Sequence, residues 1–414
     1  MNEGLVGGYV ELGLRLGRHI DGLVDAYYGP APLARRVLAE PPVSPERLAA
    51  EARGLLGRLE AGEPLDSVGS LEGSVETSST PTHPESPQRR AWLHSQLVGL
   101  LTTAASLAGT RLSYADEVEA CYGVRPNRVP EDAFAEAHAR LDAVVPGSGP
   151  VAARYVAWRE SLAVPPDRLE SAIASLAEDL RARTLAIFGL PEGERVSFEL
   201  VCDRPWAGFN YYLGNLSSRV AVNVDLPVLS SALAHLVAHE AYPGHHTEHC
   251  RKEVGLVRRG GQFEEAVFLV GTPQCLMAEG LADLGLEVVM GRRPEVLIAE
   301  HLRPLGIAYD PEVVAAVAEA GETLGAARAN AAFRLHSDGA DPEVVVDELA
   351  SWTLVPRARA AKAVEFLCDP TWRAYITCYV EGLRLCRAWV GGSPARFARL
   401  LNEQLTPADL VGSG

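Results

Sequence analysis

Apolar residues recur at intervals of three and four along most of the chain, the spacing that places them on one face of an α-helix. Pro and Gly clusters separate the periodic segments, as they do where helices end. The spacing predicts amphipathic helices over residues 48–59, 90–107, 131–144, 151–162, 169–188, 295–302, 311–335, 342–354 and 371–390. Residues 1–20 resemble the first turns of a further helix and lack the features of a signal peptide. The pattern therefore predicts a mainly α-helical protein.

Residues 196–226 break the helical pattern. In 197–202 and 217–226, apolar residues alternate with other residues and Val is frequent, as in β-strands. The segment between them, DRPWAGFNYYLGN, contains the Pro, Gly and Asn that are typical of turns. We expect one short hairpin or small sheet here, directly before the most unusual segment of the chain.

Residues 63–88 form a second break. They are rich in Ser, Thr, Pro, Gly and Glu and have almost no apolar side chain to bury. This composition is typical of a flexible surface loop and does not by itself mark a domain boundary. No internal repeat of fixed period occurs, so we interpret residues 1–414 as a single mainly helical domain that carries this loop.

The composition excludes several classes of partner. The 414 residues include 54 Asp and Glu against 38 Lys and Arg, a net charge of -16. An acidic surface repels phosphate backbones and anionic lipid, so we expect no nucleic-acid or membrane partner. No apolar run has the ~18 residues of a membrane span. The seven cysteines form no CxxC pair, which favours reduced thiols in a cytoplasmic protein over a disulfide framework.

Five of the 11 histidines lie in one segment, LAHLVAHEAYPGHHTEHC. Clustered neutral imidazoles are good ligands for zinc. His239 and Glu240 resemble the start of the HExxH motif, in which the glutamate is the general base of a zinc peptidase. The position of the second histidine in that motif is occupied here by Pro243. The five histidines are His235, His239, His245, His246 and His249.

The spacing leaves the second histidine ligand open. On an unbroken helix, His246 would lie about 20° from His239, whereas His245 would point away. Pro243 and Gly244 end or distort such a helix, so the angle loses its force. Geometry alone therefore leaves both His245 and His246 as candidates.

The segment HEAYPGHH resembles the signature of a large bacterial family known as domain of unknown function 885. Members of this family are regarded as mainly helical zinc metallopeptidases of the gluzincin type. The resemblance covers most of the chain, from AYYGP at residues 26–30 to the C-terminal helices. It implies a zincin-like helical fold with the β-element beside the active-site helix. It also implies that His239 and His245 bind Zn²⁺, with His246 as a supporting neighbour.

A later segment, MAEGLADLGLEV, offers a carboxylate as the third ligand. Glu279 and Asp283 are four residues apart and share a helix face. In gluzincins an ExxxD pattern places the Glu on the metal and the Asp on the far nitrogen of a histidine ligand. The resemblance therefore implies that Glu279 binds zinc and that Asp283 orients a ligand imidazole. Many relatives have Trp two residues after this glutamate; this chain has Leu281, which bears on the shape of the substrate pocket.

Other side chains are candidates for contact with substrate. Tyr379, with Gly382 three residues later, fits a Tyr-x-x-Gly pattern that the resemblance suggests, and its hydroxyl is a candidate donor to a developing oxyanion. Tyr375 is a rival, and an aromatic that fills a gap between helices is an equal alternative. Three residues of the expected hairpin are candidates for holding a peptide backbone as an added strand, with ordinary turn and strand roles as the alternative. They are Asn210, Tyr212 and Asn223.

Together these residues predict a zinc-dependent hydrolase in which Glu240 takes the proton from a zinc-activated water. The expected substrate is a peptide or another small amide, and the resemblance favours short peptides. One alternative is a zinc hydrolase of a non-peptide amide or ester. Another is a non-catalytic protein with a structural metal, in which His246 or His249 would be the fourth ligand. The last is a helical interaction scaffold without metal.

Overall fold

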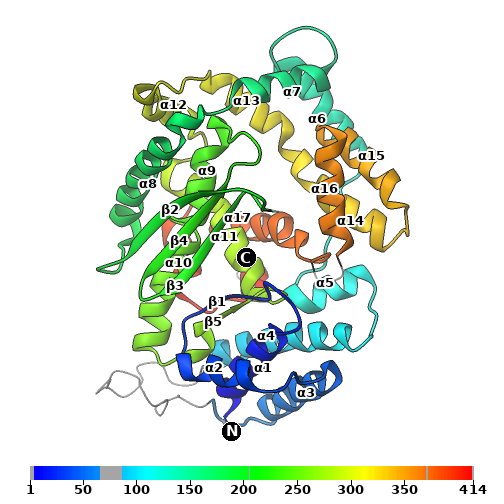
Figure 1. Ribbon diagram of the computed structural model, residues 1–414, viewed down its shortest axis with the longest axis vertical. Helices are drawn as coiled ribbons and strands as arrows, with labels where there is room; N and C mark the ends of the chain where they lie inside the picture. The colour runs from blue at the N-terminus through cyan, green and yellow to red at the C-terminus, as the bar shows by residue number, and fades with distance from the viewer. Residues whose placement is uncertain (1–3, 66–85, 205, 370–371, 413–414) are drawn as a thin grey trace.

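The computed structural model describes residues 4–65, 86–204, 206–369 and 372–412. The chain is mainly α-helical, as predicted (Figure 1). Most of the loop predicted at 63–88 lies outside the described residues. Its last two residues are helical, because they begin α4 (Pro87–Leu107). Pro at the first position suits a helix start, and the hydroxyl of Ser86 accepts a hydrogen bond from the Arg89 N–H.

Two small sheets lie among the helices, the larger one at the left of the view and the smaller one below it (Figure 1). The lower lobe in that view contains α1 (Leu5–Leu16), α2 (Ala31–Ala39), α3 (Pro45–Glu60), α4 and α5 (Tyr114–Tyr122). The upper and right-hand part contains α6 (Glu131–Val144), α7 (Val151–Ser161), α13 (Pro311–Gly321), α14 (Ala327–His336), α15 (Pro342–Thr353) and α16 (Arg357–Cys368). The remaining helices are α8 (Pro166–Phe188), α9 (Ser230–Glu240), α10 (His245–Lys252), α11 (Pro273–Met290), α12 (Glu295–Leu302), α17 (Leu383–Val390), α18 (Pro394–Asn402) and α19 (Pro407–Val411).

Short turns of other helix types join several of these elements. The π-helical turns are η1 (Glu253–Arg259) and η5 (Cys378–Gly382), and the 3₁₀ turns are η2 (Phe263–Ala266), η3 (Arg303–Leu305) and η4 (Glu322–Ala326). The helix predicted over 311–335 is therefore two helices, α13 and α14, separated by η4. Two glycines, Gly321 and Gly325, lie at this break, where glycine weakens a helix. None of the helices in the described part of the chain combines the length and apolar character that a membrane span requires.

The main sheet contains three strands in the order β2-β4-β3. They are β2 (Arg195–Val201), β3 (Gly208–Gly214) and β4 (Ser217–Asn223). The two strands expected from the sequence are β2 and β4, but they pair in parallel. The hairpin is formed by β3 and β4, through a turn with positive φ at Asn215 and Leu216. The prediction of a short hairpin or small sheet is thus confirmed, but the hairpin joins β3 and β4, because the presumed linker contains a strand.

A second sheet, absent from the prediction, joins distant parts of the sequence. Strand β1 (Val24–Tyr27) pairs antiparallel with β5 (Val267–Leu269), directly before α11. β1 also packs beside β3, where the Tyr28 ring contacts Tyr212 edge-on at 5.2 Å between centroids. The N-terminal segment is thereby placed next to the helices that carry the histidines.

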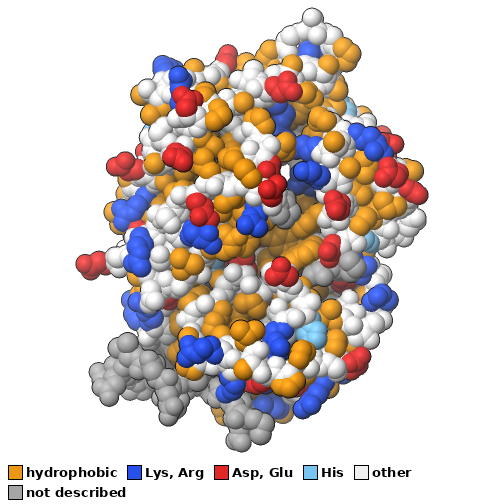
Figure 2. All heavy atoms as spheres, in the orientation of Figure 1, with side chains coloured by type: hydrophobic (Ala, Val, Ile, Leu, Met, Phe, Trp, Pro, Cys, Tyr) orange, Lys and Arg blue, Asp and Glu red, His pale blue; other side chains and the backbone are white. Residues whose placement is uncertain are grey.

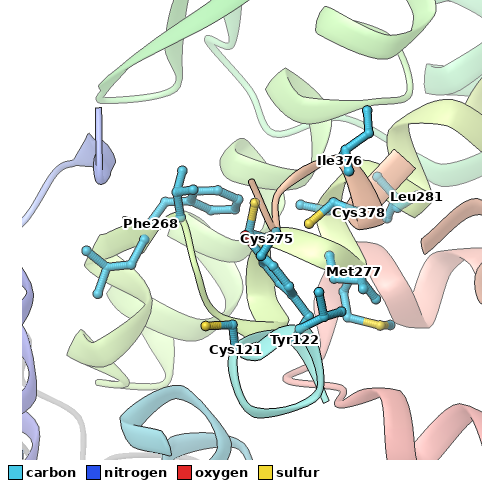
Figure 3. Packing of buried hydrophobic residues seen from close by; sticks show 14 of the residues in the cluster. Cys121, Tyr122, Phe268, Cys275, Met277, Leu281, Ile376 and Cys378 are labelled. Atoms are coloured by element: carbon cyan, nitrogen blue, oxygen red, sulfur yellow. The ribbon is translucent and has the colours of Figure 1, made fainter. Parts of the chain in front are cut away.

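Helix α11 is the structural centre of the molecule. Its residues Cys275, Met277 and Leu281 are buried against side chains of α5, β5 and the segment that leads into η5 (Figure 3). The approach of α11 to η5 is a backbone contact: a Cβ at Gly280 would lie 2.3 Å from the carbonyl carbon of Gly382. Only glycine fits there, and the contact fixes the C-terminal segment against the helix face that carries Glu279 and Asp283.

Candidate metal centre

The HEAYPGHH segment forms a sharp connection between two helices. α9 ends at Glu240 and α10 begins at His245, so the helix breaks before Pro243, as the sequence predicts. The chain folds back closely enough for the Gly244 N–H to donate to the Ala238 carbonyl at 2.9 Å. A Cβ on Gly244 would lie 1.9 Å from the carbonyl oxygen of His239, so no other residue fits this position. The reversal turns the His245 side chain back towards His239.

Three side chains from three helices converge on one point. The Nε2 atoms of His239 and His245 are 3.1 Å apart. Glu279 on α11 approaches both, with Oε2 at 3.4 Å from His239 Nε2 and Oε1 at 3.6 Å from His245 Nε2. Ligands of a tetrahedral zinc ion, each about 2.1 Å from the metal, are about 3.4 Å apart. The spacing and the donor types therefore fit a zinc ion.

The Glu279 carboxylate supports the same interpretation. Its Oε2 atom is buried and has no hydrogen-bond partner in the described structure, although such atoms are normally paired. A metal ion would satisfy this oxygen. Burial by itself would lower the pKa of His239, yet the carboxylates of Asp283 and Glu279 raise it well above the usual value. The neighbouring carboxylates thus favour positive charge at this point of the site.

Asp283 lies behind the first histidine. Its Oδ1 accepts a hydrogen bond from His239 Nδ1 at 2.9 Å, which leaves Nε2 free to face the cluster. His235 also lies near this carboxylate, at 3.5 Å from Nε2 to Oδ1. His235, His239 and Asp283 are therefore a second group with metal-ligand spacing. A metal bound by this second group would need His239 Nδ1, which already donates a hydrogen bond to Asp283. It would also leave Glu279 Oε2 without a hydrogen-bond partner.

Glu240 lies beside the cluster of His239, His245 and Glu279, and its carboxylate is not engaged by a neighbouring side chain. It is only 7% exposed, and within the described residues its carboxylate has no hydrogen-bond or ion-pair partner. Gly208 on β3 faces it so closely that a Cβ there would lie 2.9 Å from Oε1. Burial is the main reason that the pKa of Glu240 is raised, and Glu279 and Asp283 add to the effect against the two histidines. A buried carboxylate with a raised pKa is suited to accept a proton.

The two tyrosines at the C-terminal side differ in what they touch. Tyr375 donates a hydrogen bond to Glu279 Oε1 at 2.9 Å, so it holds the carboxylate of a candidate ligand. The Tyr379 hydroxyl donates to Tyr375 at 3.4 Å, and the Tyr379 side chain is 37% exposed. Burial, followed by the charge of Glu279, raises the Tyr379 pKa well above its usual value, so the phenol stays protonated. Tyr379 is the more exposed of the two side chains, and its hydroxyl does not contact Glu279 directly.

His246 is directed away from the cluster. Its Nδ1 is 2.8 Å from Ser218 Oγ and its Nε2 is 2.9 Å from Glu194 Oε2, and it is fully buried. Tyr242 and Arg181 donate to the same glutamate, at 2.7 and 2.6 Å. The expectation that His246 supports His245 directly is wrong, because the start of α10 turns adjacent side chains to opposite sides.

The three residues expected to bind substrate on the sheet all have protein partners. Asn210 donates through Nδ2 to the Glu240 carbonyl at 2.5 Å and so fixes the end of α9. The Tyr212 hydroxyl donates to Glu253, and its ring stacks on His249. Asn223 Nδ2 donates to the carbonyls of residues 204 and 206, which holds the loop before β3. The geometry gives these side chains structural contacts in place of an open surface for a peptide.

The structure adds one acidic group that the sequence prediction omitted. Asp25 on β1 lies within electrostatic range of Glu279 and Glu240. Asp25 directly precedes the AYYGP segment, whose sequence indicates no chemical role for this aspartate. Only the pairing of β1 with β5, which local pattern does not reveal, places this residue near the histidines.

No protein-family model matches the chain, and no curated protein sequence is significantly similar to it. Among solved structures, the chain is similar to a protein described as the putative lipoprotein from Colwellia psychrerythraea, with a TM-score of 0.51 and 16% identity. That match covers 94% of this chain and 79% of the other. The M32 carboxypeptidase from Deinococcus radiodurans R1 matches with a TM-score of 0.40 and 12% identity over 98% and 92% of the two chains. The first similarity shows a shared fold over nearly the whole chain, and neither shows a function.

Proposed function

We propose that the protein is a zinc-dependent hydrolase of amide bonds, most simply a peptidase that cleaves short peptides. The observation that carries the proposal is the unpaired, buried Glu279 oxygen, which lies with two histidine nitrogens beside the free carboxylate of Glu240. Three protein ligands with an adjacent general base are the composition of a catalytic zinc site. The resemblance of HEAYPGHH to the metallopeptidase family supports the same class.

In this proposal His239, His245 and Glu279 hold the ion. When bound, zinc lowers the pKa of water and polarises a carbonyl oxygen. Glu240 accepts the proton of the attacking water and returns it to the leaving amine, and Asn210 fixes the backbone from which Glu240 projects. Tyr379 donates a hydrogen bond to the carbonyl oxygen as negative charge develops there.

The contacts of the neighbouring histidines argue against a structural metal. A closed site needs a fourth protein ligand. Both nitrogens of His246 are engaged with Ser218 and Glu194. His249 is packed between the Tyr212 and Phe268 rings. Neither histidine belongs to a group of described residues with the spacing of metal ligands.

The test is hydrolysis of a mixed peptide library by the zinc-loaded protein, followed by mass spectrometry. Glu240→Gln should retain zinc and lose activity by about 10²- to 10⁴-fold, the usual contribution of a general base. Glu199→Gln is the matched control. Glu199 lies on β2, is partly exposed and forms an ion pair with Arg219 of β4. A Glu240→Gln protein as active as the control would contradict the proposal. Cleavage of amide or ester libraries alone would assign the site to a non-peptide substrate.

A further inference from the structure

Asp25 occupies an irregular position in the smaller sheet. Val24 pairs with Leu269 and Ala26 pairs with Phe268, so the register shifts at Asp25, which has no partner on β5. A residue left over in this way forms a β-bulge, and bulges redirect a side chain away from the alternation of the strand. Asp25 is therefore not constrained to the pattern of its neighbours in β1.

The surroundings of β1 locate this side chain at the candidate metal centre. On one side β1 packs beside β3, the strand whose Gly208 faces Glu240. On the other side the turn before β1 contacts the C-terminal segment, since a Cβ at Gly22 would lie 3.1 Å from the Trp372 ring. The segment that carries Asp25 thus lies between the strand that flanks Glu240 and the segment that carries the two tyrosines.

The electrostatic neighbours of Asp25 agree with this placement. Burial, followed by the charges of Glu279 and Glu240, raises the pKa of Asp25 to about 8. Asp25 in turn acts on Cys275, which lies one helical turn before Glu279 on α11. The carboxyl group therefore faces the same side of α11 as the candidate ligand.

The carboxylate of Asp25 has no protein partner to explain it. No hydrogen bond or ion pair joins it to any residue in the described ranges. It is absent from both groups of described residues whose atoms are close enough to share a metal. The residue as a whole is intermediate in exposure. A partly buried carboxylate without a hydrogen-bond partner is available to accept hydrogen bonds from a ligand.

The charge balance of the site selects a cation. Asp25, Glu240, Glu279 and Asp283 provide four negative charges when ionised, and a zinc ion neutralises two of them. The largest electrostatic influences on these carboxyl groups come from one another and from histidines, not from Lys or Arg. With all four carboxyl groups ionised, the site with zinc keeps a negative charge, which favours a substrate that carries positive charge.

We propose that Asp25 binds a primary ammonium group of the substrate and so makes the site selective for peptides with a free amino terminus near the scissile bond. This inference rests on the proposed function, because the scissile carbonyl must lie at the zinc. An ammonium group donates up to three hydrogen bonds and matches a single unpaired carboxylate. The ammonium of a lysine side chain has the same chemistry, and the experiment distinguishes the two sources.

The test measures calorimetric binding of three small zinc-chelating probes to the full-length, zinc-loaded protein. Leucine hydroxamate has a free α-ammonium group, N-acetyl-leucine hydroxamate has none, and Nα-acetyl-lysine hydroxamate has only the side-chain ammonium. The wild type should bind leucine hydroxamate about 10- to 100-fold more tightly than its acetylated form, the usual value of a charge-assisted hydrogen bond. Asp25→Asn should bind both leucine probes alike. The matched control Asp21→Asn changes an exposed aspartate just before β1 and should keep the preference.

The outcomes separate this inference from the proposed function. Equal binding of both leucine probes by the wild type would overturn the role of Asp25 and leave a zinc hydrolase intact, and this comparison needs no variant. Tighter binding of the lysine probe than of leucine hydroxamate would overturn the assignment to the amino terminus. Loss of zinc from Asp25→Asn would make Asp25 a metal ligand and also overturn it. A wild type that retains no zinc after loading and binds none of the probes would overturn the proposed function itself.

Discussion

His245 and His246 are neighbours in sequence and lie in two different kinds of environment. His246 belongs to a sealed network with Glu194, Ser218, Tyr242 and Arg181, in which each ring nitrogen and both carboxylate oxygens have partners. His245 belongs to an open cluster in which a buried glutamate oxygen and the Glu240 carboxylate accept no hydrogen bond from the described residues. Figure 2 shows a hollow between the sheet and α16 that is lined mainly by apolar side chains and rimmed by charged ones.

The difference separates structural from chemical use of the same residue types. A Ser, a His and a Glu within hydrogen-bond distance could suggest nucleophilic catalysis, but Ser218, His246 and Glu194 are all buried and mutually satisfied. Such a network stabilises the fold at the junction of β2, β4 and α10. The unsatisfied atoms of the other cluster have a cost that only a bound ion or substrate can offset.

The largest expected contrast comes from replacing each histidine of the pair. His245→Ala should abolish stoichiometric zinc binding because one of three ligands is lost. His246→Ala should keep about one zinc per chain and lower the free energy of unfolding by about 2–4 kcal/mol, since buried partners are left unpaired. Elemental analysis and denaturant unfolding measure both effects. Zinc loss in His246→Ala with retention in His245→Ala would reverse the comparison.

The next contrast concerns the two tyrosines of the open cluster. Tyr379→Phe should lower kcat by about 10²- to 10³-fold with little change in KM or zinc content, as for loss of an oxyanion donor. Tyr375→Phe should instead weaken zinc binding, because its hydroxyl holds Glu279. Steady-state kinetics on a cleaved peptide, with zinc titration, distinguish the two. A Tyr379→Phe enzyme with unchanged kcat would remove this residue from the reaction.

The sealed network should be visible in the pH dependence of stability. Burial would raise the pKa of Glu194, but the hydrogen bonds from His246, Tyr242 and Arg181 outweigh it and lower the pKa to about 2. A lowered folded-state pKa stabilises the protein above the ordinary pKa of a glutamate, and this stabilisation is lost as pH falls from about 4.5 towards 2. Glu194→Gln should therefore cost up to about 3 kcal/mol at pH 7 and less at pH 4. Chemical unfolding at both pH values measures this, with Glu192→Gln, an exposed neighbour, as the control. A cost independent of pH would show that the charge of Glu194 is unimportant.

The smallest effect on zinc binding is expected from Asp283, which accepts a hydrogen bond from the ligand His239. Asp283→Asn should lower zinc affinity by about 10- to 100-fold, because the imidazole of His239 loses its orienting carboxylate. Glu287→Gln, one turn further along α11 and paired with Arg387, should leave the affinity unchanged. Competition with a chromophoric chelator measures both constants. Complete loss of zinc from Asp283→Asn would favour the group that contains His235.

The sequence predicted most of the helices and the composition of the site, because both depend on local pattern. Periodicity located α6 and α12 to the residue. Pro243 predicted that the helix breaks after His239. Because of that break, the directions of His245 and His246 relative to His239 could not be predicted from helix geometry. Which way His245 and His246 point depends on the contact of Gly244 with α9, a detail of tertiary packing.

What the sequence did not reveal arises from contacts between distant segments. Strand β3 resembled a linker because Gly208 and Gly214 bound it, and glycine at those positions serves close approaches to Glu240 and Tyr28. Asp25 gained a place in the site only through the pairing of β1 with β5. Asn210 was predicted to hold a peptide backbone, whereas its amide donates to the backbone carbonyl of Glu240.

The most direct test of the account is an anomalous-scattering map, recorded at the zinc absorption edge from crystals of the zinc-loaded protein. The account predicts one peak at about 2.0–2.2 Å from Nε2 of His239, Nε2 of His245 and an oxygen of Glu279, with the remaining position open to solvent. A peak between His235, His239 Nδ1 and Asp283, or one that includes a nitrogen of His246, would contradict it.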